Sequence, residues 1–121
     1  MARTIKLWVL LLVTCVLLSA SGARALQCPQ PQPSSQAGVI PESAVRIEDL
    51  SALLESGDRA NRIGIIVHNL RQAYPAAPKA DIVNCLVGAF CPVVNQQNGL
   101  GDAEKRARID QFTQQVSTIV F

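Results

Sequence analysis

The chain has 121 residues and a mass of 13.0 kDa, so we expect one small domain rather than several. Hydrophobic residues make up 49% and charged residues 17% of it. The formal net charge is +2, and no cluster of basic residues gives the footprint of a nucleic-acid-binding protein.

Residues 1–25 have the layout of a signal peptide. Arg3 and Lys6 give a basic start, residues 7–20 are an apolar run, and Ala23-Arg24-Ala25 matches an A-x-A cleavage site. The run is shorter than the roughly 20 apolar residues that span a bilayer, and no second hydrophobic span follows it. We therefore expect cleavage after Ala25 and export of a product without a transmembrane span. The periplasm is the favoured destination, and the extracellular space is the alternative.

Removal of this leader changes the charge of the protein. Three basic residues leave with it and no acidic one does, so eight basic and nine acidic residues remain, for a net charge of −1. The product keeps four aromatic residues: Tyr74, Phe90, Phe112 and Phe121. With so few rings on which bases can stack, we expect no nucleic-acid partner. An uncleaved anchor is the alternative, whereas lipidation at Cys28 is disfavoured by the large polar Gln27 before it.

Residues 26–40 are expected to form an extended, proline-rich tail. Proline at positions 29, 31 and 33 fixes φ and disfavours a helix at each preceding residue. Gly38-Val39-Ile40 is too short to count as a strand. We interpret the tail as a spacer or strap, and a ligand for an aromatic groove is the alternative. Residues 41–121 then form the helical domain.

Two amphipathic helices are predicted after Pro41. Apolar residues recur at helical spacing in the first: Ile47, Leu50 and Leu54. This helix is expected to end near Ser56-Gly57. Asp58 can cap the second helix, which Pro75 should end by Tyr74. Because Gly57 alone need not break a helix, one long bent helix is the alternative.

The segment Ala80–Cys91 is predicted to be the central helix. Pro78 suits a first helical turn, and apolar residues cover almost the whole circumference of the segment. A helix of this kind is either buried or spans a membrane, and this one is too short to span. Pro92 lacks an amide proton, so the helix should kink or stop around Phe90 or Cys91.

The last helix is predicted over Asp102–Ile119, after a polar turn at 95–101. Its apolar residues repeat at helical spacing: Ile109, Phe112, Val116 and Ile119. Asp102 with Arg106, and Glu104 with Arg108, are spaced as i,i+4 ion pairs. We expect the terminal Phe121 to pack under the bundle. Together the segments predict an all-α fold, a small bundle of three or four short helices.

Three cysteines remain after removal of the leader: Cys28, Cys85 and Cys91. If residues 85–91 are helical, their ends are separated by about 9 Å of rise, beyond the roughly 7 Å that a disulfide allows. We therefore favour a Cys28–Cys91 bond, with Cys28–Cys85 as the alternative. Such a bond closes a loop of roughly 60 residues and contributes about 4 kcal/mol in the chain-entropy model. The third thiol is expected to be a buried, inert small hydrophobe, and an intermolecular disulfide is the alternative.

No catalytic, cofactor or metal site is predicted. His68, the single histidine, fits a surface position, although with Cys85 and Cys91 it would offer three metal ligands. His68 with Cys85 is also the one conceivable catalytic dyad, but nothing nearby marks an oxyanion site. No C-x-x-C motif occurs, which disfavours thioredoxin-like chemistry. We expect a protein that is not an enzyme.

Two function classes remain open on the sequence. The first is a small binding or structural module of the cell envelope that acts through a protein partner or an apolar ligand. The second is a stress-responsive periplasmic holdase, and it has a resemblance to small acid-protection chaperones in size, helicity and cysteines. A holdase should bind a hydrophobic dye at roughly pH 2 to 3, as in acid-expanded states, and a constitutive binding module should not.

Overall fold

The computed structural model describes residues 26–29 and 40–121, and most of these residues are helical. Four helices follow in chain order: α2 (Ala44–Glu55), α3 (Arg59–Ala73), α4 (Lys79–Asn95) and α5 (Asp102–Val120). The described ranges contain no strand. The all-α fold class predicted from the sequence is therefore confirmed, whereas the leader and most of the proline-rich tail lie outside the described residues.

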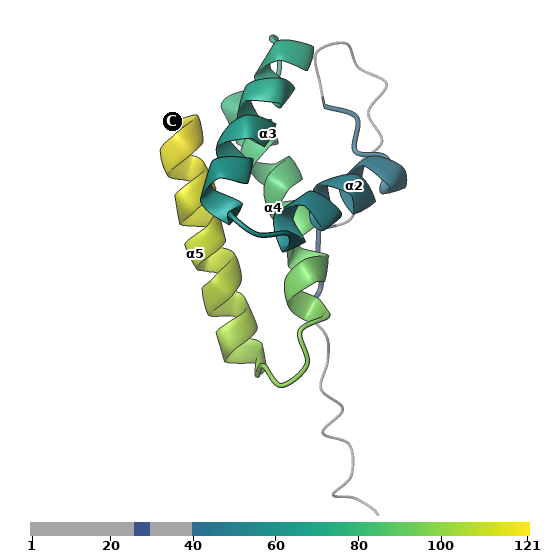
Figure 1. Ribbon diagram of the computed structural model, residues 1–121, viewed down its shortest axis with the longest axis vertical. Helices are drawn as coiled ribbons and strands as arrows, with labels where there is room; N and C mark the ends of the chain where they lie inside the picture. Colours follow the sequence, from purple (N-terminus) through teal and green to yellow (C-terminus); the bar gives the residue numbers. More distant parts are fainter. Residues whose placement is uncertain (1–25, 30–39) are drawn as a thin grey trace, which may run out of the picture.

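Helix α4 lies in the middle of the bundle. It packs against α5 along one side and α2 on another, while α3 contacts α2 and α5 (Figure 1). Nine of its side chains are buried: Ile82, Val83, Cys85, Leu86, Ala89, Phe90, Cys91, Val93 and Val94. This confirms the predicted central helix. Ile40, predicted to be the last residue of the tail, is also part of the core at 2% exposure.

Of the two outcomes predicted near Phe90 or Cys91, a kink or an end of the helix, the end is wrong, because α4 continues through Pro92 to Asn95. Pro92 cannot donate to the Gly88 carbonyl, but two features support the extra turn. Val93 and Val94 after it are buried in the core. The neighbouring Ala89 carbonyl oxygen lies 2.7 Å from the Ser51 hydroxyl of α2. Apolar burial and a side-chain donor thus offset the lost helix bond.

The first two predicted helices are separate, as expected. Ser43 caps α2 by accepting from the Arg46 amide at 3.2 Å. After α2 ends, Gly57 adopts φ 62°, a left-handed backbone conformation that residues other than glycine rarely adopt. Asp58 then caps α3 by accepting from the Asn61 amide at 3.4 Å. Gly57 and the Asp58 cap together separate the two helices where one bent helix was the alternative.

Helix α5 buries Phe112, Val116 and Val120. The Phe112 ring stacks on Phe90 of α4, with centroids 4.0 Å apart. Phe121 is 74% exposed, so its predicted packing under the bundle is wrong. Successive helical residues differ by about 100° in direction, so an inward Val120 turns the next side chain away from the core. The Lys79 Nζ atom lies over the Phe121 ring, 5.5 Å from its centroid.

Glu104 and Arg108, which i,i+4 spacing would pair with each other, each bond to another partner. Glu104 Oε2 accepts from the Gly101 amide at 3.1 Å, which satisfies a free donor at the helix start. Arg108 Nη1 donates to Gln97 Oε1 at 2.7 Å. These bonds fasten the α4–α5 turn to the helix that follows it.

Candidate functional site

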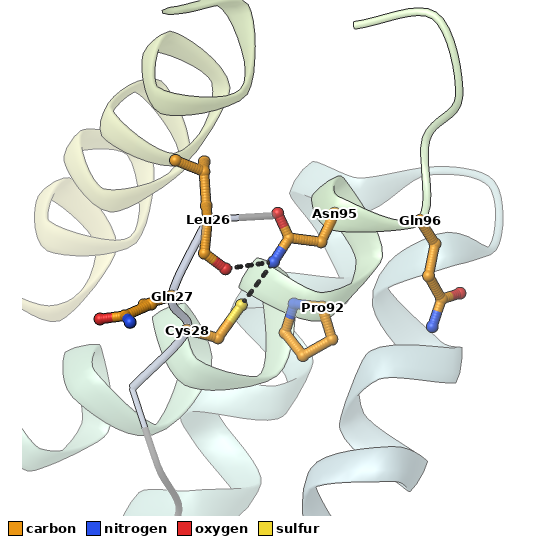
Figure 2. A pocket seen from close by; sticks show the side chains of 6 residues that line it. All are labelled: Leu26, Gln27, Cys28, Pro92, Asn95 and Gln96. Atoms are coloured by element: carbon orange, nitrogen blue, oxygen red, sulfur yellow. Dashed lines mark hydrogen bonds between the residues drawn. The ribbon is translucent and has the colours of Figure 1, made fainter. Parts of the chain in front are cut away.

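Residues 26–29, which we call the strap, lie against the C-terminal end of α4. Asn95, the last residue of that helix, donates from Nδ2 to the Leu26 carbonyl oxygen at 2.6 Å and lies 3.1 Å from Cys28 Sγ (Figure 2). The Asn95 carbonyl accepts from Lys105 Nζ of α5 at 3.2 Å. One residue thus connects the strap, α4 and α5. The sequence did not predict this role of Asn95, because asparagine is common at helix ends and the residue lies within the predicted polar turn.

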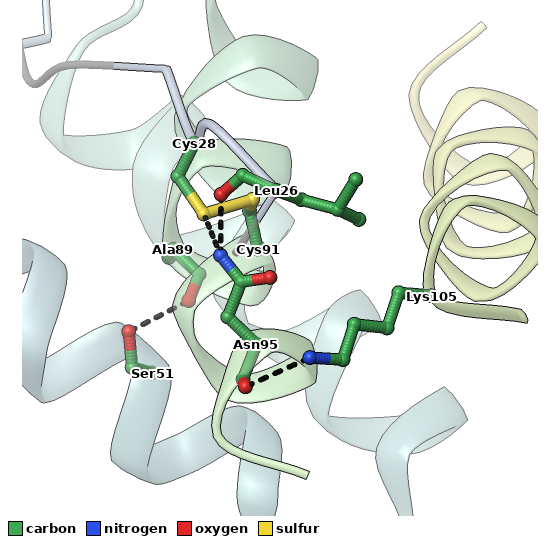
Figure 3. Close-up of a disulfide and its surroundings, with 7 residues drawn as sticks. All are labelled: Leu26, Cys28, Ser51, Ala89, Cys91, Asn95 and Lys105. Atoms are coloured by element: carbon green, nitrogen blue, oxygen red, sulfur yellow. Dashed lines mark hydrogen bonds between the residues drawn. A yellow bond between two sulfur atoms is a disulfide. The ribbon is translucent and has the colours of Figure 1, made fainter. Parts of the chain in front are cut away.

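A disulfide fixes the strap to α4. Cys28 and Cys91 have their sulfur atoms 2.10 Å apart and their Cα atoms 5.6 Å apart (Figure 3). This is the pairing that the sequence analysis favoured, and Cys85 does not take part in it. The bond spans 63 positions of the sequence, for which the chain-entropy model gives about 4 kcal/mol.

A hollow of about 650 Å³ opens beside the strap. Its wall is made by the strap residues 26–28 and by Pro92, Asn95 and Gln96 of α4 and its C-cap. The Asn95 side chain also holds a buried atom, Oδ1, which has no hydrogen-bond partner among residues 26–29 and 40–121. The hollow therefore has an apolar proline face, and one of its lining residues carries an unused buried acceptor.

A groove of about 500 Å³ lies between α2 and the end of α4. Its apolar lining comes from Ile47 and Ala52 of α2 and from Val93 of α4. Glu48 and Glu55 also line it, and both are exposed. Their spacing of seven residues puts the two carboxylates on one face of α2. In the described part of the chain, no Lys or Arg lines this groove.

The two hollows adjoin. Pro92 and Gln96 line both of them, so together they follow the last turn of α4 from the strap on one side to α2 on the other. The extra helical turn after Pro92, which the sequence did not predict, therefore forms much of the candidate site. The remaining part is the acidic face of α2.

Cys85 is fully enclosed in the core and is a free thiol. Burial raises the pKa of this thiol from 9.0 to about 11; the nearby Glu42 carboxylate adds to the rise and the Arg46 guanidinium opposes it. A nucleophilic cysteine needs the opposite, an accessible thiol of lowered pKa. The structure thus agrees with the expectation of a buried, small hydrophobic side chain.

The residues that would form a metal site or a catalytic dyad are not brought together. His68 is exposed on α3, Cys85 is buried, and Cys91 is bonded to Cys28. Within the described ranges, no three His, Cys, Asp or Glu residues gather as metal ligands would. Over those ranges, too, every helix is too short or too polar to cross a membrane.

The end of α4 thus brings together an apolar groove, two carboxylates and a covalently attached strap, all features that can contact a ligand. Comparison of the chain with models of protein families, with curated proteins and with solved structures finds no match.

Proposed function

We propose that this protein is an exported helical binding module that holds an apolar, positively charged segment of a partner protein in the α2–α4 groove. The observation that carries the proposal is the groove itself. It is lined by Ile47, Ala52 and Val93 and by two exposed glutamates. An amphipathic helix with one apolar face and basic residues beside it complements such a surface, because helix-in-groove recognition combines apolar anchors with charges on the rim.

Export is supported by two features of the chain. The leader pattern of residues 1–25 precedes the strap directly. The disulfide between the strap and α4 suits a periplasmic or extracellular protein, because the cytosol keeps thiols reduced. A small domain with a covalent tie of this kind is also able to present a constant groove without a large core.

Binding is tested with a fluorescent amphipathic peptide of leucine and lysine, measured by fluorescence anisotropy. Ala52→Arg fills the groove and repels the lysines, so we expect it to weaken binding by at least about tenfold. Replacing Glu48 and Glu55 with glutamine is expected to weaken binding several-fold and to remove most of its salt dependence.

Ile65→Arg is the matched control, because Ile65 is a 59% exposed hydrophobic residue of α3 that does not line the groove. It should leave the affinity unchanged. A peptide with glutamate in place of lysine should bind far more weakly. Equal loss of binding in Ala52→Arg and Ile65→Arg, or equal binding of the two peptides, would contradict the proposal.

Export is tested by the intact mass of the product released from a secreting host, before and after reduction. We expect a chain that starts at Leu26 and gains two hydrogen atoms per molecule when its disulfide is reduced. A product that keeps residues 1–25, or that shows no mass change on reduction, would contradict this part of the proposal.

A further inference from the structure

We propose that the hollow beside the strap is a binding site for the protein's own new amino terminus, the Leu26 α-ammonium group released by cleavage after Ala25. This inference rests on the export part of the proposed function. The site would use Asn95 Oδ1 as its acceptor, so that removal of the leader fastens the strap more firmly to α4. The ligand is a primary ammonium group held in place by the chain that carries it.

Distance places the new amino group at this site. The Leu26 carbonyl oxygen is 2.6 Å from Asn95 Nδ2. Standard bond lengths put the nitrogen of a residue roughly 3 Å from its own carbonyl oxygen, so the Leu26 nitrogen is within about 6 Å of the Asn95 amide. The amino group released by cleavage is therefore a near neighbour of the Asn95 side chain.

The orientation of the Asn95 amide leaves an acceptor for this group. If its oxygen and nitrogen were exchanged, two oxygens would face each other at the Leu26 carbonyl, so Nδ2 must be the group that donates. Oδ1 is then enclosed and, within the described ranges, lacks a hydrogen-bond partner. A backbone amide at Leu26 has one proton, whereas the ammonium group created by cleavage has three. Cleavage therefore supplies donors where an unused acceptor lies.

The charges around the site favour binding of a cation, and one lysine side chain competes with it. Asn95 ends α4, where the free carbonyl groups give the helix its negative pole. Lys105 of α5 already donates to the Asn95 carbonyl, on the backbone rather than on the side chain. Glu48 and Glu55 of α2 line the adjoining groove and add negative charge on the other side of Pro92.

The test compares two forms of the protein that differ by one residue. Both are released in vitro from a fusion by a protease, one starting at Leu26 and the other at Ala25, with the Cys28–Cys91 bond intact. The extra residue displaces the ammonium group by up to about 3.6 Å. Because the strap must loosen before a reductant reaches the bond, we expect the form starting at Ala25 to be reduced at least about fivefold faster.

Asn95→Ala should remove this difference, so that both forms are reduced at the same rate. Gln96→Ala is the matched control, because Gln96 lines the same hollow and is exposed, and it should keep the difference. Circular dichroism checks that each variant retains its helices. Equal reduction rates of the two unsubstituted forms, or a difference that persists in Asn95→Ala, would overturn the inference. Since the forms are made in vitro, this result is independent of whether the chain is exported.

Discussion

The two ends of helix α4 are held in place by different forces. Most side chains of residues 82–91 lie in the core, where Leu86 is fully buried and Phe90 is 2% exposed. The last turn, from Pro92 to Asn95, adjoins two hollows and is tied to the strap by a disulfide and by the Asn95 amide. Apolar burial therefore maintains the first region, whereas in the second the burial of Val93 and Val94 is joined by a covalent bond and a few directed hydrogen bonds. Substitutions in the first region should act on global stability, and those in the second on the attachment of the strap.

Phe90→Ala is expected to have the largest effect. Its ring stacks on Phe112 at 4.0 Å and carries the Arg59 guanidinium 4.9 Å above its centroid. Loss of a buried phenylalanine costs about 3–5 kcal/mol, much of the stability of a small domain. Urea unfolding followed by circular dichroism measures the change. A loss below about 1 kcal/mol would show that the core is not tightly packed at this end of α4.

Removal of the disulfide by Cys28→Ala is expected to lower the free energy of unfolding by up to about 4 kcal/mol, because the unfolded chain regains the freedom of a loop spanning 63 positions. The helices should remain, since their contacts lie among residues 40–121. Thermal unfolding and circular dichroism measure both quantities. Loss of helical signal at low temperature in Cys28→Ala would show that the strap is needed for the bundle to fold.

The accuracy of prediction from sequence follows the same division between the two regions. Apolar periodicity is a strong local signal, so the four helices and the buried face of α4 were predictable, and helix rise excluded a Cys85–Cys91 bond. The turn after Pro92 was not, because it depends on Val93, Val94 and the Ser51 hydroxyl, which come together in the tertiary structure. The role of Asn95 was hidden for the same reason, since its partners are 67 and 69 positions away in the sequence.

The Cys85 thiol provides a pH-dependent test of whether water is excluded from the core around the first region of α4. Its pKa rises from 9.0 to about 11 in the folded protein, because burial disfavours the thiolate. The folded state therefore keeps its proton more tightly than the unfolded state does. The contribution of this thiol to the free energy of unfolding is therefore fully present below pH 9 and is lost as pH rises through about 11. Two pKa units correspond to about 2–3 kcal/mol.

Cys85→Ala isolates this effect from the other groups that titrate in alkali. The substitution removes the titrating thiol, so its free energy of unfolding should fall less than that of the unsubstituted protein between pH 9 and 11. Urea unfolding across this range measures the two slopes. Parallel curves for the two proteins would mean that water reaches Cys85 in the native state.

Ser51→Ala is expected to have the smallest effect and tests the boundary between the two regions. The Ser51 hydroxyl lies 2.7 Å from the Ala89 carbonyl oxygen, and also 2.7 Å from the Ile47 carbonyl of its own helix (Figure 3 shows the first). Its single proton is shared between them, so the net loss should be about 1 kcal/mol. If the hydroxyl supports the turn after Pro92, hydrogen exchange of the Val93 and Val94 amides should accelerate in Ser51→Ala, while that of Leu86 changes only by the global loss of stability. Uniform acceleration at all three amides would instead show that Ser51 acts on the whole bundle and that α4 does not divide at Pro92.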